Sequence, residues 1–263
     1  LTSTAYGRLF IPQALLSIGA AALNPQLVRR LGAKTVYVLG LVANLLSMAL
    51  LTLSVPWMKN PAITQLMLPV ATGCLGLGFG LLVPTLNAVA ARLIPSKVDT
   101  MLLSLNALLG VGTALAPIFI ALFAAIGSWW GLPVSLTLLL ILLLLLSVTL
   151  AFPEEVPPSA AKGMAAIPTR FWIFAAFALM YGIIETLSGN WVSIYMKTHL
   201  HATLAMQSLA LTAFWGMVTF GRVFYALMER VLSPKIAFQL SPFISAGAFV
   251  VIASLSPGAT YWA

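Results

Sequence analysis

One carboxylate lies inside a long apolar segment in the last third of the chain. Glu185 is the only charged residue between Arg170 and Lys197. A charged side chain at the centre of a membrane-spanning helix costs roughly 3 kcal/mol on insertion scales, so it turns toward a partner or a wet cavity. Three roles are open to Glu185: it binds and releases a proton, it accepts hydrogen bonds from a substrate, or it is a structural partner of Arg222.

The depth of Arg222 argues against the third role. Arg222 precedes Arg230 by eight residues, a helical rise of about 12 Å. This places Arg222 toward the inner side of a membrane, whereas Glu185 lies near its centre. The sequence therefore favours a snorkelling or gate-forming arginine over a pair with Glu185.

Polar side chains accompany Glu185 at helical spacing, because residues three or four apart share one face of a helix. The stripe of Glu185 contains Tyr181, Ser188 and Tyr195. The next apolar segment carries a second stripe, formed by Ser208, Thr212, Trp215, Thr219 and Arg222. We predict that these stripes line a substrate or proton site.

Asn190 and Trp191 add an amide and an aromatic platform to the first of these segments. Sugar-like or amphipathic ligands use this combination. The alternative is that Trp191 packs between helices or reaches the outer interface.

Two earlier segments carry small and polar residues at the same spacing. One face contains Gly73, Gly76, Gly80, Pro84 and Asn87, and the other contains Asn106, Gly110, Thr113 and Pro117. Small residues on one face favour close helix packing, although a proline can free backbone carbonyls toward a cavity. We include Asn87 and Asn106 among the candidate site residues.

The composition determines which elements position these residues. Hydrophobic residues make up 61% of the chain and charged residues 7%, with a mean hydropathy of +1.06, whereas soluble domains contain about 25% charged residues. Apolar runs of about 20 residues match the length that a helix needs to cross a bilayer. We predict an all-α polytopic membrane protein with eight spans, at 9–28, 34–55, 63–90, 102–127, 132–152, 171–196, 204–228 and 236–256.

Basic residues gather in alternate loops between these spans. These loops hold nine of the thirteen, namely Arg29, Arg30, Lys34, Arg92, Lys97, Lys162, Arg170, Arg230 and Lys235. By the positive-inside rule these loops are cytoplasmic. The net charge of +8 then serves orientation and contact with anionic head groups, and no basic run interleaved with aromatics indicates a nucleic-acid partner.

A polar stretch and a repeat divide the chain. Residues 151–171 contain four prolines and both charge signs, which predicts a cytoplasmic linker at 153–170 between bundles at 1–152 and 171–263. Similar segments begin at Gly19 and Gly221, and repeated halves are typical of secondary transporters. The offset predicts an interior window of a longer protein, missing one helix in front and about three behind.

The basic turn "PQLVRRLGAK" resembles the loop between the second and third helices of the major facilitator superfamily. Arg30, Gly32 and Lys34 match the pattern G-x-x-x-D-R-x-G-R-K, whereas Pro25, Arg29 and Ala33 depart from it. The resemblance implies two six-helix halves, of which the chain covers helices two to nine. It also implies gating roles for basic residues at helix ends: Arg30, Lys34, Arg222 and Arg230.

Two longer stretches, "YGIIETLSGNWVSIYM" and "AFWGMVTFGR", look closer to the fucose and glucose symporters of that family. The resemblance implies symport of a sugar-like small molecule with H⁺ or Na⁺. The alternative is a drug or metabolite efflux antiporter, because "GVGTALAPIF" keeps part of an exporter pattern.

Other classes fit less well. A channel would show charged rings or a carbonyl filter, and an enzyme would need catalytic groups near one another. His199 and His201 have no third donor nearby, so no metal site is predicted, and no cofactor is expected. We expect a monomeric multi-pass protein of the cell membrane, in bacteria the inner membrane, acting on a small solute and not as an enzyme.

Overall fold

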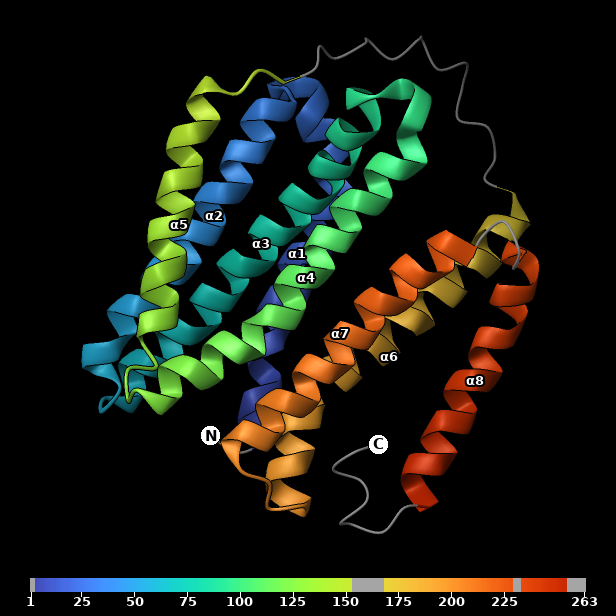
Figure 1. Cartoon of the computed structure of the whole chain (residues 1–263). Coiled ribbons are helices and arrows are strands. Elements are labelled where there is room, and N and C mark those ends of the chain that lie inside the picture. Colours follow the sequence, from blue (N-terminus) through green and yellow to red (C-terminus); the bar gives the residue numbers. More distant parts are fainter. Residues whose placement is uncertain (1–2, 153–167, 229–232, 255–263) are drawn as a thin grey trace. The chain divides into compact units, whose positions relative to one another are not determined.

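The computed structural model describes residues 3–152, 168–228 and 233–254, and these residues form helices joined by short turns (Figure 1). The α-helices are α1 (Ser3–Leu31), α2 (Ala33–Ser54), α3 (Pro61–Leu93), α4 (Val98–Ala125), α5 (Gly131–Thr149), α6 (Thr169–His199), α7 (Leu204–Met228) and α8 (Pro234–Ser254). Two single 3₁₀ turns, Val55–Trp57 and Pro95–Lys97, precede α3 and α4. Each of the eight predicted spans coincides with one helix, which confirms the all-α prediction.

Seven of these helices are long and apolar enough to cross a membrane. The exception is α1, which includes Arg8, Gln13 and Asn24 and ends with Arg29 and Arg30. The polar residues of α1 lower its mean hydropathy, although its 29 residues would extend over about 43 Å.

Local chemistry determines where the helices turn. Gly32, at φ 84°, separates α1 from α2, a backbone conformation that only glycine adopts without strain. The N-terminus of α3 is capped by Asn60, whose side chain accepts from the backbone N–H groups of Ala62 and Ile63, and Pro61 is tolerated in the first helical turn.

The chain divides into two compact units, one of residues 1–105 and 123–157 and the other of residues 106–122 and 158–263. In the first unit, α3 packs against both α1 and α2, and α2 also packs against α5. Most of the predicted linker at 153–170, namely residues 153–167, lies outside the described residues. The predicted bundle boundaries and the repeat of Gly19 and Gly221 therefore stay predictions.

Glycines allow α1 to approach α3 closely. A Cβ on Gly76 would overlap the backbone of Gln13, and a Cβ on Gly80 would lie 2.8 Å from the Cβ of Ala20. A Cβ on Gly73 would meet Leu16 at 3.1 Å. The prediction that this face serves close helix packing is confirmed.

The second unit contains the helix pair α6 and α7, joined by residues 200–203. Near this turn, Met196, Leu200 and Ala202 form a buried cluster. The Ala202 N–H donates to the Met196 carbonyl over 3.0 Å, and the Gln207 side chain donates to the Ala202 carbonyl over 2.9 Å. These contacts hold α6 and α7 together at the turn end of the pair.

Candidate functional site

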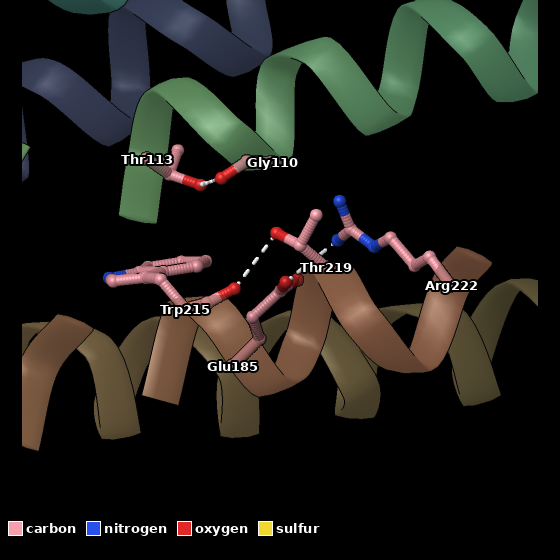
Figure 2. A network of polar contacts seen from close by, with 6 residues as sticks. All are labelled: Gly110, Thr113, Glu185, Trp215, Thr219 and Arg222. Atoms are coloured by element: carbon pink, nitrogen blue, oxygen red, sulfur yellow. Dashed lines mark hydrogen bonds and ion pairs between the residues drawn. The ribbon is translucent and has the colours of Figure 1, made fainter. Parts of the chain in front are cut away.

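Glu185 and Arg222 form an ion pair between α6 and α7 (Figure 2). The Nη2 atom of Arg222 donates to Oε1 of Glu185 over 2.9 Å. The Glu185 side chain keeps 19% of its surface exposed and the Arg222 side chain 34%. The carboxylate is thus neutralised by one guanidinium, while both groups retain part of their solvent access.

The depth argument against this pair was wrong. Counted from the turn that joins the helices, Glu185 lies about 21 Å from His199 and Arg222 about 27 Å from Leu204, at about 1.5 Å per residue. The two depths therefore differ by about 6 Å, a distance that a long, flexible arginine side chain can span. A comparison of backbone depths leaves out the long side chain of Arg222, which lets its guanidinium reach the level of Glu185.

An aromatic contact lies on the turn side of the ion pair. A Cβ on Gly189, one turn after Glu185, would come within 2.6 Å of Cζ2 of Trp215. The indole of Trp215 therefore occupies the space that a side chain at Gly189 would need. We call Glu185, Arg222, Gly189 and Trp215 the α6–α7 polar seam.

Hydroxyl groups accompany the seam on α7. Thr219 Oγ1 donates to the Trp215 carbonyl over 2.8 Å, and Figure 2 shows this bond beside the ion pair. In the same unit, a Cβ on Gly110 of α4 would overlap the Thr219 side chain. One turn from Trp215, the buried Oγ1 atom of Thr212 has no hydrogen-bond partner among the described residues.

The other predicted residues of α6 differ in burial. Tyr181 and Tyr195 are exposed and Ser188 is half-buried. The Tyr195 ring lies 5.3 Å from that of His199. Because each helical residue turns by about 100°, Asn190 lies about 140° around α6 from Glu185. Trp191, like Asn190, is half-buried and lies outside the polar seam.

The two candidate asparagines of earlier helices have different surroundings. Asn87 is half-buried and donates to the Val83 carbonyl of its own helix over 3.0 Å. Asn106 is half-buried on α4. Neither is a member of the polar seam.

The predicted gating residues also separate. Lys34 Nζ donates to the Val148 carbonyl in the last turn of α5 over 3.0 Å, whereas Arg30 is exposed. Arg222 joins the polar seam, and Arg230 lies outside the described residues. A cation at a helix C-terminus stabilises that end through the helix dipole, so Lys34 has a structural contact of its own.

Sequence reasoning missed a buried polar network between α1 and α3. The Asn24 side chain, 4% exposed, donates to the Leu81 carbonyl and to Thr85 Oγ1, each over 2.9 Å. Thr85 Oγ1 in turn donates to the Leu81 carbonyl over 2.8 Å. An amide inside an apolar run was the available signal, but its partners are about 60 residues away along the chain.

Comparison with known proteins supplies the family. Among the described residues, no group of three or more His, Cys, Asp or Glu side chains could hold a metal ion. No curated protein and no solved structure gives a significant match to the chain. The model of the Major Facilitator Superfamily matches residues 1–263, so the chain belongs to this superfamily of membrane-embedded secondary transporters, which are not enzymes.

Proposed function

We propose that this secondary transporter is an ion-coupled symporter of a small hydroxylated solute, sugar-like in its chemistry. In this proposal Glu185 binds the coupling ion, H⁺ or Na⁺, and Arg222 occupies the carboxylate when the ion is absent. The observation that carries the proposal is the 2.9 Å ion pair between two apolar helices.

The pair can occupy two states, which differ in what neutralises the carboxylate. Without the ion, the guanidinium neutralises the carboxylate. When a proton or Na⁺ binds Glu185, the attraction that holds Arg222 is lost and the guanidinium is released to donate hydrogen bonds elsewhere. A ligand that binds one of two states more tightly shifts the population toward that state. Binding of the ion and binding of the solute therefore reinforce each other when the solute accepts hydrogen bonds from the released Arg222.

The surroundings support a hydroxylated solute. Trp215 offers an aromatic surface beside the pair, and Thr212 Oγ1 is a buried hydroxyl without a partner among the described residues. Buried polar groups are normally hydrogen-bonded to protein or water, so a water or a solute hydroxyl is the natural partner of Thr212. Tyr181 and Ser188, on the flank of the Glu185 face, add hydroxyl groups that could extend such a site.

The test is solute-driven ion movement in proteoliposomes that contain the purified chain. A panel of radiolabelled sugars and polyols is added outside, and internal pH or Na⁺ is followed with a trapped dye. Symport requires that the ion enters together with the solute, whereas ion exit would establish an antiporter and overturn the proposal.

The variant Glu185→Gln keeps the shape of the side chain and removes its charge. If Glu185 couples the ion, gradient-driven accumulation should be lost while counterflow exchange of the solute survives. If Glu185 only binds the solute, accumulation and exchange should fall together. Asp99→Asn, at an exposed acid in the first turn of α4, is the control that removes a carboxylate outside the seam. Undiminished accumulation by Glu185→Gln would refute a role of this carboxylate in coupling.

A further inference from the structure

Two buried oxygen atoms of α2 have no hydrogen-bond partner among the described residues. They are Oδ1 of Asn44 and Oγ of Ser47, and Ser47 as a whole is 0% exposed. Buried polar atoms are normally bonded to a protein group or to ordered water, because a buried acceptor or donor without a partner keeps its full desolvation cost. Two such atoms three residues apart on one helix indicate a small polar ligand that serves both.

Ser47 differs from the other buried hydroxyl groups that the structure describes in the first unit. Ser54, Thr85 and Ser147 are each at most 3% exposed. Their hydroxyls donate to carbonyls of their own helices, over 2.7, 2.8 and 2.6 Å respectively. A back-bond of this kind satisfies a hydroxyl without any partner outside the helix. Ser47 makes no such bond, so its hydroxyl is available to another group.

The face of α2 that carries these oxygen atoms packs on α3. A Cβ on Gly40 would lie 3.3 Å from the Gly78 carbonyl of α3, and a Cβ on Gly78 would overlap Oδ1 of Asn44. Ser47 follows Gly40 by two helical turns and lies on the same face. The two helices run in opposite directions, so Ala71, two turns before Gly78, lies at the level of Ser47. Ala71 is 1% exposed, and its methyl group can neither donate nor accept a hydrogen bond.

One water molecule matches the spacing and the chemistry of the two oxygen atoms. Side chains three residues apart on a helix have Cβ atoms about 5–6 Å apart, a gap that two successive hydrogen bonds of about 2.8 Å can span. A water can donate to Asn44 Oδ1, which only accepts, and can accept from the Ser47 hydroxyl. The Ala43 carbonyl, four residues before Ser47, has a second lone pair. It offers a third hydrogen bond, and about three is the usual number for a buried water.

We propose that Asn44 and Ser47 bind one internal water molecule in the interface of α2 and α3. A cation is a poorer ligand, because the amide, the hydroxyl and the carbonyl are neutral and a buried charge without a counter-charge is costly. The water holds both side chains in one arrangement beside the close contact of Gly40 and Gly78. This site belongs to the first unit, and the proposal does not depend on the role of Glu185.

Water-edited solid-state NMR of the full chain in lipid bilayers tests the site directly, because magnetisation passes from water only to nearby protein atoms. The Cβ signal of Ser47 should build up as early as the signals of exposed serines, although the residue is fully buried. Ser147, which is 1% exposed and donates to the Leu143 carbonyl, is the matched control and should build up late. A Ser47 signal as late as that of Ser147 would overturn the proposal. So would a Ser47 chemical shift that follows the Na⁺ concentration, because it would show a bound cation.

A double-mutant cycle tests whether the two side chains share the water. Ser47→Ala, Asn44→Leu and the double variant are denatured in detergent and followed by circular dichroism. With a shared water, Ser47→Ala should raise the equilibrium constant for unfolding by roughly fivefold, and the double variant should lose little more than Asn44→Leu alone. Asn44→Leu should also delay the NMR signal of Ser47. Stabilisation by Ser47→Ala, as expected for a hydroxyl that simply lacks a partner, or independent effects of the two substitutions would refute the shared water.

Discussion

The indole of Trp215 covers the Cα of Gly189, so that a methyl group on this glycine would lie 2.6 Å from Cζ2 of the ring. This contact lies one turn along α6 from Glu185. An indole is rigid and cannot yield as the end of a flexible side chain can. The glycine therefore determines how closely α6 and α7 approach at the level next to the ion pair.

Gly189→Ala should destabilise the helix pair by about 1–3 kcal/mol, the usual cost of overpacking a tight contact. Gly182 on the same helix has open space around the position of a Cβ. Gly182→Ala should therefore be neutral or should stabilise α6 by up to about 1 kcal/mol through helix propensity. Denaturation in detergent, followed by circular dichroism, compares the two; equal effects would show that the Trp215 contact is not tight.

The Glu185–Arg222 pair should show energetic coupling in a double-mutant cycle. Its side chains are partly exposed, so the coupling should lie between the roughly 0.2–1 kcal/mol of surface pairs and the 3–5 kcal/mol lost when a buried pair is broken. We expect about 1–2 kcal/mol from Glu185→Gln, Arg222→Gln and the double variant, measured by denaturation. Strict additivity of the two single effects would contradict the pair.

The positions of the helices could be predicted from the sequence because an apolar run of bilayer length leaves the backbone few alternatives. The packing role of Gly76 and Gly80 was also predictable, since small residues at helical spacing permit close approach. Both properties depend on local sequence alone.

Pairing between helices was not predictable in the same way. The partner of Glu185 depends on the register of α6 against α7, which no local pattern in either helix specifies. The partners of Asn24 depend on how α1 packs on α3. A single amide or carboxylate in an apolar run indicates that a partner exists but does not indicate which one.

Asn24→Ala should destabilise the first unit by about 1–3 kcal/mol, because the buried Leu81 carbonyl and Thr85 hydroxyl lose a donor. Asn87→Ala is the matched variant, since the Asn87 amide donates only within its own helix and is half-buried. Its effect should stay within about 0.5 kcal/mol, as for substitutions away from buried networks. A larger loss for Asn87→Ala than for Asn24→Ala would contradict the importance of the α1–α3 network.

The predicted orientation can be tested at two exposed lysines, Lys59 and Lys97. The positive-inside rule places Lys97 in the cytoplasm and Lys59 outside. In a Cys74→Ala background, a membrane-impermeant maleimide should label Lys59→Cys in intact cells and Lys97→Cys only after permeabilisation. The reverse labelling pattern would show that the chain has the opposite orientation in the membrane.

Substitutions at Lys34 can distinguish a helix-capping role of this residue from a gating role. Its ammonium group donates to the Val148 carbonyl at the end of α5 over 3.0 Å, and removing such a cation should cost about 0.3–1 kcal/mol. Lys34→Met should lower stability by this amount, and Lys34→Arg, which keeps the charge and donors, should restore most of it. Lys97→Met, at an exposed lysine, is the control and should leave stability unchanged.

If Lys34 only caps α5, solute exchange per folded molecule stays at the wild-type level in Lys34→Met. A severalfold loss of exchange at unchanged stability would instead assign Lys34 to the gate that the family pattern implies.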